Sequence, residues 1–212
     1  MQHYDIIGDI HGQATKLENL LETLSYKLIN NVYQHASRKV IFVGDFIDAG
    51  PEETKTLTIV KNMVEANSAL AIMGNHEFNA ICYATPNSDK PNTYLREHSS
   101  KNFGQHQAFL TEYPFGSQKH TDIINWFKSL PVYLDLEQIR VIHACWHEDS
   151  LAIINKSLNE NKTIPDHMFI TASDKSHEHY DAIENVMKGL EQQLPHGVTF
   201  KDKYNILALK FD

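Results

Sequence analysis

Acidic, imidazole and amide side chains gather in three short strings, each of which follows an apolar segment. The strings are Gly8-Asp9-Ile10-His11-Gly12, Gly44-Asp45-Phe46-Ile47-Asp48 and Gly74-Asn75-His76-Glu77. Carboxylate, imidazole and carboxamide groups are ligands of hard or borderline divalent cations. Loops that leave the ends of neighbouring strands can bring such groups to one point, and glycine lets the backbone turn sharply there. The pattern therefore predicts a metal site suited to phosphoester chemistry.

Each of these residues also has an ordinary structural interpretation. Asp9 and Asp45 would cap turns, Asn75 would cap a helix, and His143, in the later string Val141-Ile142-His143-Ala144-Cys145-Trp146, would be a hydrogen-bonded core histidine. For Asn75 and His143 taken singly, that interpretation is the commoner one. Together the ordinary interpretations fail, because carboxylates and imidazoles gathered at strand ends without a cation would repel one another or titrate abnormally.

The four strings, in this order and each at a strand exit, resemble those of the calcineurin-like metallophosphoesterases. The likeness is to the phosphoprotein-phosphatase branch and its bacterial diadenosine-tetraphosphatase-like relatives. It runs through residues 5–150 and includes the stretches Asn102–His106 and Trp126–Leu130. It implies an α/β fold, a calcineurin-like β-sandwich flanked by helices, in a single domain over residues 1–212. Whether the second sheet is complete is left open.

The resemblance also implies the metal ligands. Asp9 and His11, two residues apart and so on one side of an extended segment, hold the first metal. Asp45 bridges both ions, and Asn75 and His143 hold the second. This N and O donor set, without a thiolate, suits Mn²⁺, with Fe²⁺, Zn²⁺ or Mg²⁺ as alternatives. Two such ions hold a hydroxide that attacks phosphorus.

His76 adjoins a ligand but is not itself a ligand in the family, so it is the expected general acid that protonates the leaving alkoxide. Asp48 is its expected partner, because a carboxylate bonded to one ring nitrogen fixes the tautomer and raises the pKa of the imidazole. Glu77 is expected to be structural.

Two departures from the family pattern stand out. The phosphoprotein phosphatases continue the second string with an arginine that grips the substrate phosphate, where this chain has Ala49. Arg96, in a loop with Lys101 close by, is the expected substrate-binding replacement, and a solvated loop charge is the equally open alternative.

The second departure is the final histidine ligand, which the family carries in a Gly-His string well after the position of His143. None of the later histidines follows a glycine at the end of an apolar segment; they are His147, His167, His177, His179 and His196. We therefore expect a C-terminally shortened chain whose second metal site is weaker. Water, a buffer anion or a histidine such as His147 would complete that site.

Strand and helix signals alternate along the first eighty residues, as in parallel strands joined by crossover helices. Leucines at 17, 20, 21, 24 and 28 recur at helical spacing, and Thr15 with Glu18 has capping-box spacing. The elements that we expect are strands at 4–8, 39–43, 69–73, 132–134 and 139–142, helices at 51–66, 102–111, 121–130, 148–159 and 179–189, a long loop at 85–101, and a hairpin of 198–201 with 205–209.

Composition narrows the class of protein. The chain has 212 residues, 42% hydrophobic and 22% charged, with a formal net charge of −8. It is long enough for one sizeable α/β domain, and its composition is ordinary for a globular protein. The acidic balance and the lack of a basic stripe disfavour nucleic acid as a partner. Cys82 and Cys145 lack CxxC spacing and are expected to be buried thiols.

No apolar run nears the roughly 18 residues of a membrane helix, and the N-terminus enters a strand at once, without a secretion signal. We therefore expect no membrane association and a cytoplasmic location. The expected function is hydrolysis of phosphomonoesters or phosphoanhydrides, with a phosphoprotein or a nucleotide as substrate. A degenerate metal-binding homologue without turnover is the alternative, and a nucleic-acid end-processing phosphatase is disfavoured.

Overall fold

A parallel three-stranded sheet in the order β1-β4-β5 organises the N-terminal part of the computed structural model, which describes residues 2–193, 195, 199–201, 207–208 and 210–211. Its strands are β1 (His3–Ile7), β4 (Arg38–Phe42) and β5 (Ala69–Ala71). The pairs run from His3 opposite Arg38 to Ile7 opposite Phe42, and β5 begins opposite Val40. Because the strands are parallel, their carboxyl ends share one edge, and the three strings of the sequence leave the sheet there.

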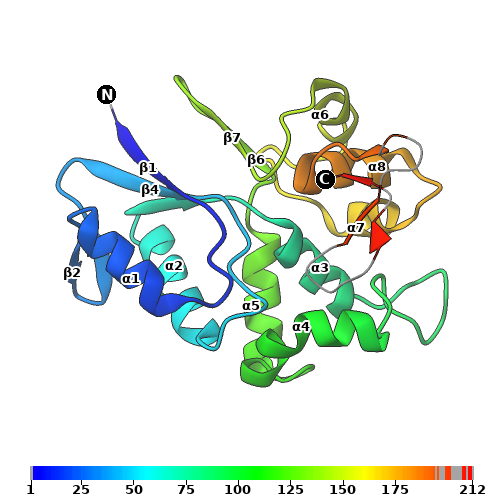
Figure 1. Cartoon of the computed structure of the whole chain (residues 1–212), viewed down its shortest axis with the longest axis horizontal. Coiled ribbons are helices and arrows are strands. Elements are labelled where there is room, and N and C mark those ends of the chain that lie inside the picture. Colours follow the sequence, from blue (N-terminus) through cyan, green and yellow to red (C-terminus); the bar gives the residue numbers. More distant parts are fainter. Residues whose placement is uncertain (1, 194, 196–198, 202–206, 209, 212) are drawn as a thin grey trace.

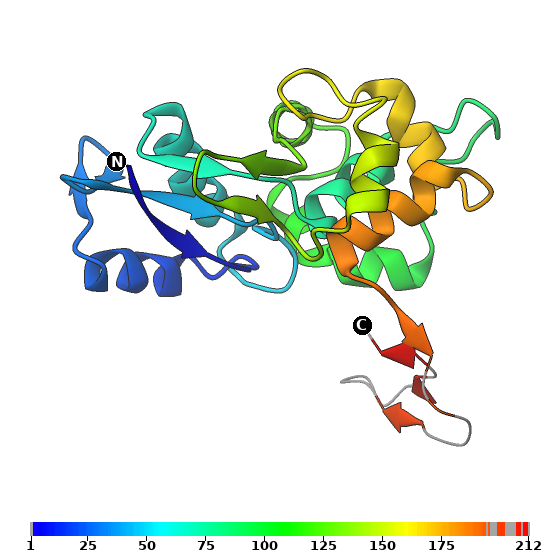
Figure 2. The same cartoon turned by 90° about the horizontal axis from the view of Figure 1, so that it is seen from above.

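Both faces of this sheet are covered. Val40 and Phe42 point into a large core with helices α1 (Ala14–Thr23) and α2 (Glu53–Glu65). Ile41, between them, points to the opposite face and packs with Ile72 and Val141. Figures 1 and 2 show the hairpin of β6 (Tyr133–Asp135) and β7 (Arg140–Ile142) on this second face, away from α1 and α2. Among the described residues, the hairpin is the layer that faces the sheet.

The remaining helices lie beyond the carboxyl edge of the sheet. In Figure 1, α6, α7 and α8 form one group, at the far side of the molecule from α1 and α2, and α3, α4 and α5 lie below that group. Their cores join that of the sheet in one continuous apolar cluster, from Ile7 to Met187. The bounds are α3 (Asn75–Ala84), α4 (Ser100–Glu112), α5 (Gln118–Lys128), α6 (Glu148–Ile154), α7 (Asp166–Ser173) and α8 (Glu178–Lys188).

The prediction of one leucine-lined helix through Leu28 is wrong at its C-terminal end. α1 stops at Thr23, and Leu28 lies in β2 (Lys27–Ile29), which pairs with β3 (Val32–Gln34). The connecting residues Asn30 and Asn31 have φ of +50° and +64°. Asparagine tolerates this conformation, which a two-residue hairpin turn requires. The Asn-Asn pair was therefore the local signal that overrode helical periodicity.

The predicted capping box is also wrong, because α1 has no side-chain cap of its own. Instead the carboxylate of Glu52 accepts hydrogen bonds from the backbone N–H and the hydroxyl of Thr15, at 2.9 and 2.8 Å. Helices α3 and α7 were not predicted. Of the predicted C-terminal hairpin, Phe200–Lys201 pairs with Leu207–Ala208, whereas Val198, Asn205 and Leu209 lie outside the described residues. The other predicted strands and helices are confirmed within a few residues, although α6 ends earlier than expected.

Candidate active site

The loops after β4 and β5 approach each other backbone to backbone, and two glycines make this possible. A Cβ atom on Gly44 would collide with the backbone nitrogen of Gly74, and one on Gly74 would collide with the carboxylate of Asp45. Gly44 also has φ of +90°, which side chains strongly disfavour. The glycines of the second and third strings therefore allow the close contact that places Asp45 beside the start of α3.

Glu77 holds the two loops together through their backbone N–H groups. Its buried carboxylate accepts hydrogen bonds from the backbone N–H groups of Asp45 and Phe46, both at 2.8 Å, and of Gly74 at 3.0 Å. Burial and the charge of Asp45 raise the pKa of Glu77 to about 7. Glu77 thus lies in the frame of the site, as expected from the sequence.

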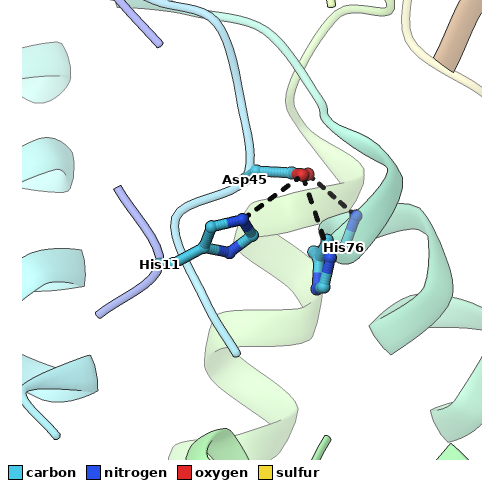
Figure 3. Close-up of side chains that lie close together, drawn as sticks. All are labelled: His11, Asp45 and His76. Atoms are coloured by element: carbon cyan, nitrogen blue, oxygen red, sulfur yellow. Dashed lines mark hydrogen bonds and ion pairs between the residues drawn. The ribbon is translucent and has the colours of Figure 1, made fainter. Parts of the chain in front are cut away.

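Asp45 lies at the centre of a cluster of imidazoles. Its Oδ2 atom is 4.0 Å from Nε2 of His11, 3.9 Å from Nε2 of His76 and 3.5 Å from Nε2 of His143. Figure 3 shows His11 and His76 directed at the Asp45 carboxylate from two different elements. Asp45 is only 4% exposed, so this convergence occurs at the bottom of the site.

The tautomers of the histidines are set by what their other ring nitrogens contact. Nδ1 of His11 lies 2.8 Å from the carbonyl oxygen of Ile47, and Nδ1 of His143 lies 2.6 Å from that of Val43. A carbonyl only accepts, so Nδ1 carries the proton in both rings, and Nε2 of the neutral ring has a free lone pair aimed towards Asp45. The same holds for His76, whose Nδ1 donates to Asp48. This donor set fits a divalent cation.

Asp9 and Asn75 complete the cluster. Oδ2 of Asp9, on a side chain 57% exposed, is 3.9 Å from Nε2 of His11. Oδ1 of Asn75 is 3.1 Å from Nε2 of His143. The potential ligand atoms fall into two groups of three residues, and within each group they lie within 4.8 Å of one another. The first group is His11, Asp45 and His76, and the second is Asp9, Asp45 and His143. In the first group, His76 faces the same point as the proposed ligands His11 and Asp45. In the second group, Asp9 is also close to His143.

The backbone route to the first pair differs from the predicted one. Residues after β1 leave the extended conformation, and His11 has φ of +47°. His11 nevertheless faces Asp9, because the turn is held by backbone N–H groups of Ile10 and His11 that both donate to the carbonyl of Asp45, at 2.9 and 3.0 Å. The same-side argument from strand geometry was therefore wrong in its reason, although the two side chains do meet.

Asp48 links two histidines. Its Oδ2 accepts a hydrogen bond from Nδ1 of His76 at 2.8 Å, and its Oδ1 accepts one from Nδ1 of His106 at 2.9 Å. Burial opposes ionisation of Asp48, but the hydrogen bonds of His106 and His76 lower its pKa below the ordinary value. Burial likewise opposes the charge on His76, but Asp48 and the charge of Asp45 raise the pKa of His76. His106 was not predicted as a site residue, although it ends the family-like stretch Asn102–His106.

The electrostatics of the cluster are dominated by Asp45. Burial opposes its charge, but contact with His143 and the nearby charge of His76 lower the pKa of Asp45. Burial opposes protonation of His143, whereas the carboxylate of Asp45 and the carbonyl of Val43 raise the pKa of His143 to about 9. Without a cation, the cluster therefore takes up a proton at His143, which a metal ion would displace.

A cavity of about 620 Å³ opens beside this cluster and is lined by Asn75, His76 and Asp48 on one side. Arg96 forms part of its wall. The guanidinium donates to Oδ1 of Asn79 at 3.0 Å and to Oε1 of Gln105 at 2.9 Å, both of which are neutral acceptors. Arg96 is half-buried, so the structure does not support the alternative of a fully solvated loop charge.

Two other expectations need correction. His147 was considered as a replacement ligand, but it caps α6, where its Nδ1 accepts from the backbone N–H of Ser150 at 3.3 Å, and it is in neither group of potential ligands among the described residues. Cys82 is buried as predicted, whereas Cys145 is partly exposed.

No helix of the described part of the chain has the length and apolar character to cross a membrane.

Comparison with known proteins indicates the family of this chain. The chain is 34% identical over 141 residues to asymmetrical bis(5'-nucleosyl)-tetraphosphatase PrpE of Oceanobacillus iheyensis, covering 66% of this chain and 54% of that protein. It is 42% identical over 74 residues to PrpE of Anoxybacillus flavithermus, covering 34% of this chain and 30% of that protein. The chain thus spans about half the length, or less, of these curated relatives.

A solved structure of a cold-active protein tyrosine phosphatase has the same fold, with a TM-score of 0.51 at 15% identity over 86% of this chain and 52% of that one. The family model described as calcineurin-like phosphoesterase matches residues 3–200. The fold class predicted from the four strings is therefore confirmed, and the protein belongs to the calcineurin-like phosphoesterase family.

Proposed function

We propose that this protein is a metal-dependent hydrolase of phosphoric ester or anhydride bonds. One observation carries the proposal: the Nε2 atoms of three histidines converge within 4.0 Å of a single buried carboxylate oxygen of Asp45, beside an open cavity. Asp9, His11, Asp45, Asn75 and His143 are the proposed ligands of two divalent ions, with Mn²⁺ as the first metal to test.

When bound, the ions would polarise the phosphoryl group and lower the pKa of a coordinated water. The chain itself supplies the remaining parts. His76, with Nδ1 held by Asp48, presents Nε2 towards the cluster and is the proposed donor of a proton to the leaving oxygen. Its position in the first group of potential ligands supports this role, because the nitrogen lies within 4.8 Å of the ligand atoms of His11 and Asp45.

Arg96 is the proposed phosphate-binding residue, because its guanidinium is hydrogen-bonded to two neutral acceptors and it lines the cavity next to His76. Lys101 and Lys175 line the same cavity. Glu97 and Glu184 line it too, so the cavity carries charges of both signs, and Arg96 with the two lysines offers the cationic groups that a phosphate could contact. A second cavity of about 910 Å³ adjoins the first, with Leu95, Glu97, Ser173 and Lys175 in the lining of both, which is compatible with a substrate longer than a phosphomonoester.

These features, together with the names of the PrpE relatives, favour a dinucleoside polyphosphate over a phosphoprotein. The experiment compares hydrolysis of diadenosine tetraphosphate, a serine phosphopeptide and p-nitrophenyl phosphate by the same protein, before and after EDTA treatment and Mn²⁺ addition. The expected result is metal-dependent turnover with the highest kcat/KM on diadenosine tetraphosphate. A preference for the phosphopeptide would overturn the substrate assignment without overturning the hydrolase.

The rival is a degenerate homologue that binds metal without turnover. It is favoured by Ala49, where phosphoprotein phosphatases carry arginine, and by the lack of a sequence match for the last histidine ligand. Metal content measured by elemental analysis separates the two: two ions with turnover support the hydrolase, and one ion without turnover supports the rival. An Asp45→Asn variant serves as the matched control for metal that is bound elsewhere. A cytoplasmic location stays a prediction.

A further inference from the structure

The carboxylate of Asp48 is held by two rings rather than one. His76 occupies Oδ2 at 2.8 Å and His106 occupies Oδ1 at 2.9 Å, each through Nδ1. Because each oxygen has its own donor, the carboxylate cannot rotate without breaking one of the two bonds. Asp48 is only 4% exposed, so loss of one donor would leave a largely buried carboxylate oxygen without its partner.

Within the described part of the chain, no other hydrogen bond of the His106 ring explains its burial. It is 4% exposed, and its Nε2 makes no hydrogen bond within the described residues. The ring stacks on Phe109, with centroids 4.8 Å apart, and lies against Tyr83 at 5.2 Å. Aromatic packing thus fixes the plane of the imidazole, and the bond to Asp48 is its sole hydrogen bond in the described structure.

We infer that His106 is a positioning residue for the proposed reaction: it fixes the Asp48 carboxylate so that Asp48 holds His76 with Nε2 directed at the leaving oxygen. The contact spans 58 residues of sequence and joins helix α4 to the loop after β4. Asp48 has φ of +66°, so its backbone is held in a conformation that costs free energy and persists only where the surroundings determine it. His106 is one of the groups that do so.

This inference rests on the proposed hydrolysis with His76 as proton donor, and the test separates the two. A misdirected proton donor harms poor leaving groups most, because these depend on protonation. His106→Leu, loaded with Mn²⁺, should lose about 10- to 100-fold in kcat on phenyl phosphate but less than about threefold on p-nitrophenyl phosphate. KM and Mn²⁺ stoichiometry should stay within about twofold. An equal loss on both substrates, or no loss, would overturn the inference.

His120→Leu is the matched control. His120 is also a buried histidine with an unpartnered Nε2, and it packs against the same Phe109 ring, but it does not contact Asp48. The same substitution there should lower thermal stability without changing the ratio of kcat on the two substrates. A changed ratio in this control would mean that repacking of the aromatic cluster, rather than the hydrogen bond to Asp48, is responsible.

A conservative pair keeps the test open if His106→Leu does not fold. The side-chain amide of His106→Asn can place an N–H near the position of Nδ1, whereas His106→Gln places it further out, near Nε2. His106→Asn should therefore retain the wild-type ratio of kcat on the two substrates, and His106→Gln should not. Equal ratios in the two variants would contradict the inference.

A measurement that does not depend on hydrolysis tests the positioning role even if the proposed function is wrong. In the metal-free protein, at a pH at which the His76 imidazole is neutral, its ¹⁵N NMR spectrum should show a single tautomer with the proton on Nδ1. His106→Leu should convert His76 to a mixture of tautomers, whereas His120→Leu should not. An unchanged His76 spectrum in His106→Leu would overturn the positioning role, whether or not the protein hydrolyses phosphate esters.

Discussion

Glu53 should make the stability of this protein fall as pH rises, and the effect can be isolated by one substitution. The residue lies at the start of α2 with 0% of its surface exposed, and neither carboxyl oxygen makes a well-formed hydrogen bond within the described residues. Burial and the charge of Asp48 raise the pKa of Glu53 from 4.5 to about 8, although the backbone N–H of Asp48 offsets part of this rise. The folded protein therefore holds a proton that the unfolded chain releases above about pH 4.5.

The sign and size follow from this difference. The stabilisation by protonated Glu53 is fully present below pH 4.5 and is lost as pH rises towards 8. Each pH unit in this window costs about 1.4 kcal/mol, so the unfolding free energy should fall on the order of 4 kcal/mol between pH 5 and pH 8 from this residue alone. Natural domains have roughly 5–15 kcal/mol in total, so a loss of this size is readily measured.

The assay is urea unfolding followed by tryptophan fluorescence at pH 5, 6.5 and 8, with EDTA present throughout. Glu53→Gln keeps the shape of the side chain and cannot ionise, so its unfolding free energy should fall much less over this range. Glu65→Gln, at an exposed position of the same helix, should follow the wild type. Parallel pH curves for the wild type and Glu53→Gln would refute the reasoning, because they would show that the buried carboxyl does not titrate between the two states.

Three further predictions concern the site. His143 has a pKa of about 9 in the metal-free protein, so Mn²⁺ affinity measured by calorimetry should rise about tenfold per pH unit from pH 6 to 8, and an affinity independent of pH would contradict displacement of its proton. Asp45→Asn should reduce Mn²⁺ content by elemental analysis, whereas His76→Asn should keep the metal and lose about 10²–10⁴ in kcat; a metal-free His76→Asn would make that residue a ligand. Arg96→Ala should raise KM for p-nitrophenyl phosphate with Mn²⁺ present, since a charge-assisted bond contributes about 1.5–3 kcal/mol, while Arg96→Lys should retain part of it; unchanged KM in both would remove Arg96 from the substrate site.

The sequence was sufficient to predict that the proposed ligands lie together. Short strings of the sequence show which residue types can bind a metal, and parallel strands end at one edge of a sheet. Asp9, Asp45 and Asn75 each follow a strand whose apolar pattern is plain, so their neighbourhood follows from topology. The β2–β3 hairpin was missed because leucine periodicity continued past the true end of α1 at Thr23. Helix α3 was missed because Asn75 was interpreted as a metal ligand and His76 as the general acid, both on a loop, whereas they form the first turn of this helix.

His106 could not have been found by the same reasoning. It lies in an ordinary amphipathic helix, and no local pattern shows that its ring reaches a carboxylate 58 residues earlier in the chain. The position of Arg96 in the cavity wall could not be predicted from the sequence either. It depends on hydrogen bonds to Asn79 and Gln105, which belong to two different helices. Contacts of this kind come from how helices pack, and packing is determined by the whole core rather than by any one segment.

The Glu77 carboxylate has a consequence for protein engineering. It bonds to backbone N–H groups of both ligand-bearing loops, Asp45 and Phe46 in one and Gly74 in the other. Glu77 thus couples the positions of the two loops, although it lies 32 positions after Asp45 and 31 positions after Phe46 in the sequence. A side chain at Gly44 or Gly74 would collide with the opposite loop. A library that varies residues 44–48 or 74–77 should therefore keep Gly44, Gly74 and Glu77 fixed together.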